Sequence, residues 1–257
     1  MPTILEQREA FHLLFLRALV RSLPLERFVL KGGSNLRFFF GSVRYSEDMD
    51  LDASDIAVHV LADHVMAILE ALARSAAMRP HGVREVVAPD LAHAKQTETV
   101  QRFKVHLLTT ANEDLFTKVE FSRRGFDTPH KAEAVSTALL SRYRMPPLIV
   151  PHYTAETAVR QKLRALLSRP QPQARDVFDL WTLSTQVGPT GMAVAMAADE
   201  VAEARDRIFS IGFNEYRDAV VAYLGPEDQP SYDSHNFWDE IRLQVLSGIE
   251  GGQGDES

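Results

Sequence analysis

The chain contains no cysteine. Disulfide bonds, thiolate catalysis and zinc sites built from cysteine are therefore excluded. No apolar run is long enough to span a bilayer, and the apolar cluster at residues 13–16 lies between charged residues, without the layout of a signal peptide. We therefore expect no membrane association and a cytoplasmic location.

An excess of positive charge is also lacking. A net charge of −7 argues against a protein that coats nucleic acid nonspecifically, because phosphate contacts need lysine and arginine. Basic residues nevertheless recur between Arg102 and Arg175, with Arg123 and Arg124 among them, while acidic residues crowd the last third of the chain. This asymmetry predicts a basic groove over an active site, although solvated strand and helix faces would give the same pattern at any single position.

Alternating acidic and apolar residues occupy positions 48–52, Asp-Met-Asp-Leu-Asp. On a strand, Asp48, Asp50 and Asp52 would share one face while Met49 and Leu51 point into a core. Carboxylates placed side by side repel each other, and a bound hard cation relieves that repulsion. Where phosphates complete the shell, this cation is most often magnesium. We therefore predict that Asp48 and Asp50 bind magnesium, or manganese in its place.

A glycine turn precedes this acidic segment. The apolar run 28–30 leads through Lys31 into Gly32 and Gly33, and a helix capped by Ser34 can follow. Glycines let backbone N–H groups approach an anion, and the positive end of the helix faces the same point. A nucleoside triphosphate could bind there, with the Ser34 hydroxyl as a further donor. A glycine pair before a helix is also common as a plain structural turn.

Two blocks of the sequence resemble those of a known family. Residues 31–36 (Lys-Gly-Gly-Ser-Asn-Leu) and 45–51 (Tyr-Ser-Glu-Asp-Met-Asp-Leu) resemble the first motif of the AbiEii/AbiGii toxin family of nucleotidyltransferases, which includes the MenT-like toxins. Residues 161–169 and 175–180 resemble its lysine helix and the Arg-Asp-x-x-Asp-Leu motif that follows. The order and spacing of both blocks are more specific than either block alone. Gln161 stands where glutamate is expected, so that position lacks its charge.

The resemblance implies an α+β protein. Its expected architecture is a nucleotidyltransferase-fold mixed sheet with flanking helices, followed by an α-helical C-terminal domain that completes the active-site cleft. We place the catalytic domain at residues 1–150 and the helical domain at 151–250. Residues 251–257 should form a mobile tail, because they have nothing apolar to pack.

The same resemblance assigns catalytic roles to Asp48, Asp50, Lys162 and Asp176. Lys162 would supply a compact positive charge to the triphosphate. Asp176 would either orient Lys162 or assist the acceptor hydroxyl as a base. Without the motif, Lys162 would be read as a solvated lysine on an amphipathic helix, and Asp176 as a helix cap.

Two further residues enter the expected site through the resemblance. Glu120 alternates with the apolar Val119 and Phe121, so it is the candidate for a third metal-binding carboxylate from a neighbouring strand. Ser46 lies close to the predicted metal site and could help to hold phosphate. The plain alternatives are the solvent face of a strand for Glu120 and a turn residue for Ser46.

As a function, the resemblance implies the toxin half of a bacterial toxin–antitoxin pair. Such an enzyme would transfer nucleotides from a nucleoside triphosphate to RNA, with the 3′ end of tRNA as the expected acceptor, and so block translation. A separately encoded antitoxin protein would be its partner. Three alternatives stay open: transfer to a small molecule, transfer to a protein side chain, and a catalytically silent module that only binds a nucleotide or partner.

Hydrophobic periodicity predicts the coarse order of elements. We expect helices at 6–21, 34–40 and 58–75, with strands at 27–31, 48–53, around 103–107 and around 118–121. The expected C-terminal helices are 154–168, 174–186, 192–208, 213–223 and 237–246.

Overall fold

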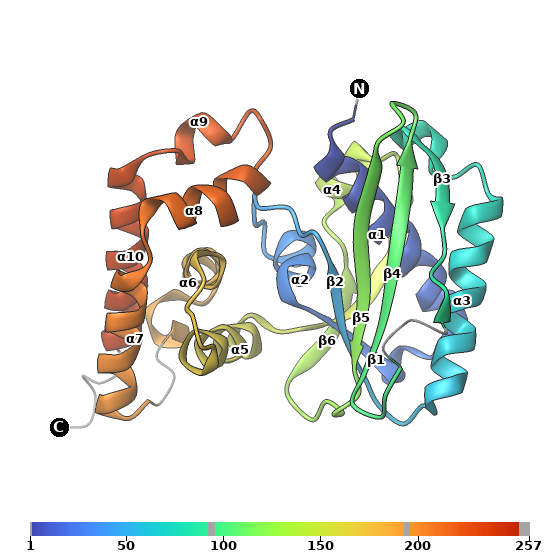
Figure 1. Ribbon diagram of the computed structural model, residues 1–257. Coiled ribbons are helices and arrows are strands. Elements are labelled where there is room, and N and C mark those ends of the chain that lie inside the picture. The colour runs from blue at the N-terminus through green and yellow to red at the C-terminus, as the bar shows by residue number, and fades with distance from the viewer. Residues whose placement is uncertain (1, 92–95, 193–195, 252–257) are drawn as a thin grey trace. The chain divides into compact units, whose positions relative to one another are not determined.

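The computed structural model describes residues 2–91, 96–192 and 196–251 (Figure 1). The chain divides into two units. The first comprises Met1–Phe39 and Tyr45–Tyr153, and the second comprises Phe40–Arg44 and Thr154–Ser257. The five residues 40–44 therefore leave the first unit and group with the helices of the second. Apart from Gly251, the expected tail lies outside the described residues.

A mixed sheet forms the centre of the first unit (Figure 1). Its strands are β1 (Phe28–Lys31), β2 (Met49–Ala53), β3 (Val83–Val87), β4 (Val100–Thr109), β5 (Asp114–Ser122), β6 (His130–Ala134) and β7 (Ile149–Tyr153). Their order is β3-β4-β5-β2-β1-β7-β6, with β2–β5 and β1–β7 parallel and the other pairs antiparallel. The predicted mixed sheet is thus confirmed. The acidic strand β2 lies at its middle.

Helices cover one face of this sheet. They are α1 (Ile4–Ser22) and α3 (Val58–Arg74), whose apolar stripes join the inward-facing strand residues in one core. Met49 and Leu51 are fully buried in that core, as their alternation predicts. Burying a side chain of this size stabilises the fold by about 1.5–3 kcal/mol. The opposite orientation of their neighbours leaves the acidic residues of β2 on the other face.

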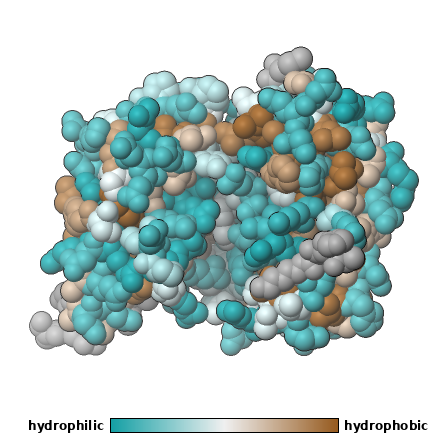
Figure 2. All heavy atoms as spheres, viewed as in Figure 1, coloured by the Kyte–Doolittle hydropathy of each residue, from teal (hydrophilic) through white to brown (hydrophobic). Residues whose placement is uncertain are grey.

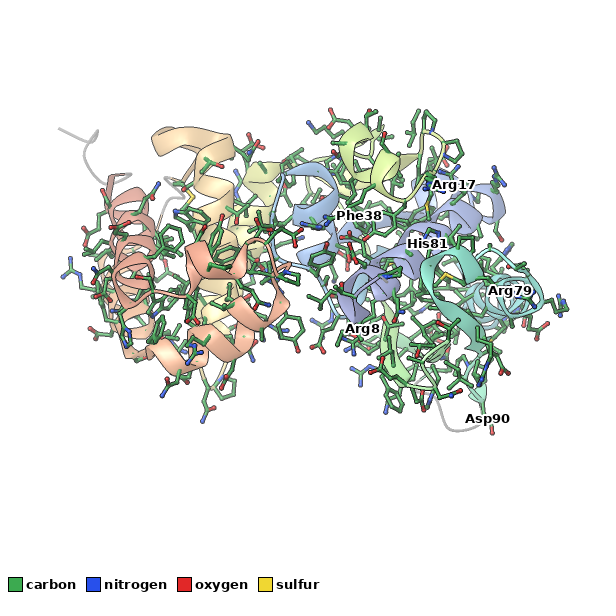
Figure 3. The ribbon with its side chains drawn as sticks, turned by 90° about the horizontal axis from the view of Figure 1, so that it is seen from above. Arg8, Arg17, Phe38, Arg79, His81 and Asp90 are labelled. Atoms are coloured by element: carbon green, nitrogen blue, oxygen red, sulfur yellow. The ribbon has the colours of Figure 1, made fainter. Side chains whose placement is uncertain are left out.

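The position of α2 (Gly32–Phe39), which carries the glycine turn, is fixed by buried polar contacts. Arg37 Nε donates to Glu9 of α1 at 2.7 Å. Asn35 Oδ1 lies 2.9 Å from Nδ1 of the buried His152. Phe38, labelled in Figure 3, is 1% exposed and packs into the core of the same unit. The short helix α4 (Thr137–Arg142) completes the unit.

Helices make up the second unit. They are α5 (Ala155–Ser168), α6 (Ala174–Met192), α7 (Ala198–Ser210), α8 (Phe213–Ala219), α9 (Gln229–Tyr232) and α10 (His235–Glu250), with a 3-10 turn at Val221–Tyr223. α5 packs against α6, and α10 packs against α6 and α7. Trp238 and Tyr216 stack at 4.5 Å within its core. Figure 2 shows hydrophilic side chains over most of the visible surface, with smaller hydrophobic patches.

Several predicted boundaries need correction. The second helix begins at Gly32, so Ser34 lies inside it and is not its cap. The helix expected over 192–208 begins at Ala198, while residues 193–195 lie outside the described part of the chain. The predicted helix 213–223 breaks at Val220, whose φ and ψ of −124° and −62° are not helical. Strands β3, β6 and β7 were not expected. β7 contains Pro151 and closely follows two further prolines, which disfavour strands.

None of the helices among the described residues is long and apolar enough to cross a membrane.

Candidate active site

Strand pairing gathers carboxylates on the face of the sheet opposite the core. In the register of β1, β2 and β5, Asp50 stands opposite Lys31 on one side and Glu120 on the other. Neighbouring strands lie about 4.8 Å apart, so these side chains are immediate neighbours. The structure therefore places Glu120 beside Asp50, as the sequence predicts.

Asp50 has the least compensated negative charge on this face. Burial raises the pKa of its carboxyl group; Lys31 opposes this rise, while Glu120 and Asp48 add to it. No described side chain forms a hydrogen bond or ion pair with Asp50. A carboxylate held in this way is stabilised by any cation that binds next to it.

The flanking acids have partners of their own. Asp48 Oδ2 lies 2.8 Å from Lys118 Nζ, and both side chains are partly exposed. Glu120 accepts a hydrogen bond from Arg102 Nε at 2.6 Å. Both carboxylates therefore lie beside Asp50, and each forms an ion pair with one basic side chain.

Asp52 is an anchor of the sheet. Its carboxylate accepts hydrogen bonds from Lys31 Nζ at 2.5 Å and from the Tyr153 hydroxyl at 2.6 Å. Burial, and then the bond to Asp52, raises the pKa of Tyr153, so its hydroxyl stays protonated as a donor. Lys31, a predicted nucleotide-binding residue, is thus engaged with Asp52.

The donor set on this face fits magnesium. Among the described residues, no group of three or more histidine, cysteine, aspartate or glutamate side chains is arranged to hold a metal ion. Magnesium, however, is usually bound by one or two carboxylates together with waters and substrate phosphates. Asp50 with Asp48 supplies such a pair, and the ion would balance the mutual repulsion of the two carboxylates.

The glycine turn lies directly against Asp50. Gly32 has a φ of +68°, which favours glycine, and a Cβ atom added there would lie 2.9 Å from Asp50 Oδ2. The absence of a side chain is therefore needed for both the backbone conformation and the close approach. The start of α2, where N–H groups lack helical partners, is held next to the carboxylate face.

Both predicted phosphate-binding serines hold the backbone of Asp48. The Ser46 hydroxyl donates to the Asp48 carbonyl at 2.7 Å, and the Ser34 hydroxyl donates to the same oxygen at 3.2 Å. Ser34 is buried, with only 1% of its surface exposed. Because each hydroxyl has one hydrogen, neither can donate to a phosphate while this contact lasts.

We expect Gly32→Ala to destabilise the protein by roughly 1–3 kcal/mol and to weaken triphosphate binding, because the new methyl group must displace Asp50. Denaturant unfolding and calorimetric titration measure these effects. Gly41→Ala is the matched control, since Gly41 has the same φ of +68° but nothing within 4 Å of its added Cβ. Equal losses in both variants would mean that backbone strain alone is responsible.

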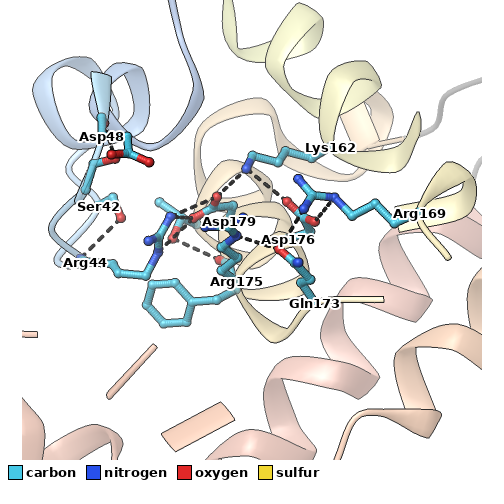
Figure 4. A network of polar contacts seen from close by, with 12 residues as sticks. Ser42, Arg44, Asp48, Lys162, Arg169, Gln173, Arg175, Asp176 and Asp179 are labelled. Carbon is cyan, nitrogen blue, oxygen red and sulfur yellow. Dashed lines mark hydrogen bonds and ion pairs between the residues drawn. The ribbon is translucent and has the colours of Figure 1, made fainter. Parts of the chain in front are cut away.

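A second charged cluster lies within the helical unit (Figure 4). Lys162 on α5 donates to Asp176 Oδ1 at 3.1 Å, and its Nζ lies 2.6 Å from Asp179 Oδ2. Both aspartates are completely buried. They lie three residues apart on α6, so they share one helix face. The structure thus brings together the predicted Lys162 and Asp176.

Arginines complete the cluster (Figure 4). Arg44 Nη2, from the segment 40–44, lies 3.1 Å from Asp179 Oδ1. Arg169 Nε lies 3.1 Å from Asp176 Oδ2, although this oxygen accepts no hydrogen bond among the described residues. Three basic side chains, those of Arg44, Arg169 and Lys162, therefore face two carboxylates. The excess of one positive charge suits an anionic ligand.

Ion pairing keeps the cluster charged despite its burial. Burial alone would raise the pKa of Asp179, but Arg44 and Lys162 hold it below the usual carboxyl value. Burial alone would lower the pKa of Lys162, but Asp179 and Asp176 raise it above the usual value. Lys162 is therefore a permanent cation, suited to binding phosphate rather than to accepting a proton.

Asp179 and Arg44 were not predicted as site residues. The signal for Asp179 was present in the spacing Arg-Asp-x-x-Asp, and Arg44 directly precedes the acidic motif. Arg123, by contrast, does not serve the predicted basic groove. Its guanidinium donates to Gln101 Oε1 at 2.9 Å and to the Ile56 carbonyl at 2.6 Å, with only 9% of the side chain exposed.

A mixed sheet with a glycine turn before an acidic strand, continued by a helical unit, defines a nucleotidyltransferase-fold protein. The family model of the nucleotidyltransferase AbiEii toxins of type IV toxin–antitoxin systems matches residues 14–240. The chain therefore belongs to this family and is a nucleotidyltransferase. Family membership implies a nucleoside triphosphate as substrate and an antitoxin as partner. No curated protein matches the chain.

Several solved structures are similar to this chain, and two of them illustrate the likeness. JHP933 from Helicobacter pylori is 21% identical with a TM-score of 0.51, covering 95% of this chain and 90% of that one. MenT4, a nucleotidyltransferase toxin from Mycobacterium tuberculosis H37Rv, is 17% identical with a TM-score of 0.56, covering 98% of this chain and 86% of that one. At such identities the likeness concerns the fold, and it confirms the predicted α+β class.

Proposed function

We propose that this protein transfers a nucleotide from a nucleoside triphosphate to the 3′ end of tRNA, with a divalent ion held by Asp48 and Asp50, and thereby blocks translation. The observation that carries the proposal is the buried Asp50 carboxylate, which forms no hydrogen bond or ion pair with a described side chain and lies directly against the glycine turn at Gly32. A cation could bind there to the Asp50 carboxylate, and a polyphosphate could bind to the backbone N–H groups at the start of α2.

The reaction needs three contributions from the chain. Backbone N–H groups of Gly32 and Gly33 bind phosphate oxygens at the start of α2. Lys162 neutralises charge on the triphosphate as the acceptor hydroxyl attacks the α-phosphorus and pyrophosphate leaves. Asp48 and Asp50 would hold a magnesium ion, which would supply positive charge to the triphosphate and make the attacking hydroxyl more acidic. Glu120 remains the candidate for a further carboxylate beside Asp50.

Asp176 is proposed to orient Lys162 rather than to act as the base. It is completely buried and its Oδ1 accepts a hydrogen bond from Lys162. A general base must reach the proton that it removes. A fully buried carboxylate already bonded to an ammonium group is better suited to fixing that group.

Exposed arginines support an RNA acceptor. Arg160 and Arg164 lie one turn apart on α5, the helix that also carries Lys162. Both are exposed, and neither makes an ion pair with any described residue. Positive charge that is not neutralised by the protein binds the phosphates of nucleic acid. A cationic small-molecule acceptor would instead be repelled.

A labelling experiment tests the proposal. The protein is incubated with each radiolabelled nucleoside triphosphate and magnesium, together with total tRNA, the antitoxin protein or a small aminoalcohol. We expect label in tRNA with the wild type and none with Asp48→Ala. Label in the antitoxin protein or in the aminoalcohol instead would mean that the acceptor is a protein or a small molecule and not RNA. Nucleotide binding without transfer to any acceptor would mean that the protein is a catalytically silent binding module.

A further inference from the structure

Lys118 contacts a carboxylate that the proposed function assigns to the divalent ion. Its Nζ lies 2.8 Å from Asp48 Oδ2, and the two side chains are 28% and 36% exposed. Lys118 also acts electrostatically on the neighbouring Asp50. An ammonium group and a divalent cation repel each other at such short distances. Binding of the ion to Asp48 therefore requires Lys118 to move.

A second lysine lies directly opposite Lys118. In the antiparallel pairing of β4 and β5, Lys104 is the register partner of Lys118, so both side chains lie on one face. Like charges placed directly opposite each other are destabilising. Lys104 is exposed and forms no ion pair with the described residues. Arg102, two residues away on β4, is by contrast bound to Glu120 at 2.6 Å. Asp48 therefore neutralises Lys118, but no described carboxylate neutralises Lys104.

We propose that Lys118 is a triphosphate-binding residue that exchanges Asp48 for a phosphate oxygen when the nucleotide enters with its divalent ion, and that Lys104 binds the same polyphosphate. The inference rests on the proposed function, because it assumes an ion at Asp48. The flexible stem of lysine and its partial exposure permit this movement. A triphosphate with one divalent ion is still an anion, which complements two ammonium groups.

The exchange couples the two ligands. Lys118 weakens the binding of the ion as long as it pairs with Asp48. This competition ends when the ammonium group of Lys118 pairs with a phosphate oxygen instead. The ion and the nucleotide should therefore each strengthen the binding of the other, as reciprocal coupling requires. Without the nucleotide, Lys118 keeps the Asp48 charge neutralised.

Two affinities test the exchange, neither of which depends on turnover. Mn²⁺ binding without nucleotide is followed by electron paramagnetic resonance, and binding of a non-hydrolysable triphosphate analogue with Mn²⁺ is followed by calorimetry. Lys118→Met should bind Mn²⁺ roughly two- to fivefold more tightly, because a partly exposed ion-pair competitor is gone. It should bind the analogue about tenfold more weakly, because a charged hydrogen bond is lost.

Two other lysines serve as matched variants. Lys104→Met should weaken binding of the analogue but leave Mn²⁺ binding unchanged, because Lys104 does not contact Asp48. Lys131→Met, on the edge strand β6 and paired with Glu133 at 3.0 Å, should change neither affinity. Lys118→Gln should change both affinities in the same directions as Lys118→Met, with tighter binding of Mn²⁺ and weaker binding of the analogue. A general loss of structure cannot produce changes of opposite sign.

The proposed exchange is wrong if the wild type binds both Mn²⁺ and the analogue and Lys118→Met weakens the binding of both, strengthens the binding of both, or changes neither affinity. A wild type that binds neither Mn²⁺ nor the analogue, separately or together, would instead contradict the proposed function itself.

Discussion

Asp50→Asn should reduce nucleotide transfer by at least about a hundredfold and leave the thermal midpoint at or above that of the wild type. Transfer fails because a neutral amide cannot balance the charge of a divalent ion. Stability does not fall, because Asp50 forms no ion pair or hydrogen bond with a described side chain and its charge is repelled by Glu120 and Asp48. Transfer assays and thermal unfolding of the same samples measure both effects.

The stability effect should depend on pH in a defined direction. Because the pKa of Asp50 is raised in the folded state, its ionisation opposes folding as the pH rises through the folded-state pKa. At neutral pH the asparagine variant avoids this penalty. Below the ordinary carboxyl pKa of about 3.9, Asp50 is protonated in both states and the advantage should disappear. Thermal unfolding at neutral and acidic pH tests this.

Asp52→Asn is the matched control, two residues along the same strand and on the same face. Asp52 is 7% exposed and receives hydrogen bonds from Lys31 and Tyr153. Loss of its charge should destabilise the protein by about 1–3 kcal/mol. If Asp50→Asn is destabilised as much as Asp52→Asn, then Asp50 is a structural residue and the metal-binding proposal loses its basis.

The local sequence pattern was enough to predict the two faces of the acidic strand β2. Alternation alone places Met49 and Leu51 in the core and Asp50 on the other face, because strand geometry repeats every two residues. The position of Glu120 next to Asp50 depends on the parallel pairing of β2 with β5. That pairing joins segments about seventy residues apart, which no local pattern records. Alternation with Val119 and Phe121 singled out Glu120 as a candidate, but it could not show which strand lies beside it.

The buried charges of the second unit show what a local sequence pattern cannot predict, namely contacts between residues far apart in the chain. Arg44 and Asp179 are 135 residues apart in the chain and form a fully buried ion pair. On sequence alone, each is an ordinary polar residue that would be placed at the surface. The predicted helix cap at Ser34 was wrong because the helix begins two residues earlier, at Gly32, so Ser34 lies inside it and donates its hydroxyl to the Asp48 carbonyl.

Asp179→Ala should cause the largest loss of stability, about 3–5 kcal/mol. The substitution removes the buried carboxylate that pairs with both the guanidinium of Arg44 and the ammonium of Lys162. Removing one partner from a buried ion pair is far more damaging than removing an exposed one. Denaturant unfolding followed by circular dichroism measures the loss.

Acid should destabilise the wild type more than this variant. Since the pKa of Asp179 is lowered in the folded state, its stabilisation is present above the ordinary carboxyl pKa and is lost as the pH falls through the folded-state value. The alanine variant has no such contribution to lose. The difference in unfolding free energy between the two proteins should therefore shrink as the pH falls below about 4.

Two further variants separate the role of Asp179 in folding from the proposed role of Lys162 in catalysis. Lys162→Met should abolish transfer. It should cost less stability than Asp179→Ala, because Asp179 stays paired with Arg44 and Asp176 stays paired with Arg169. Asp218→Ala, at an exposed position of α8, should stay within about 0.5 kcal/mol of the wild type. An Asp179→Ala protein as stable as Asp218→Ala would show that the buried carboxylate does not hold the helical unit together.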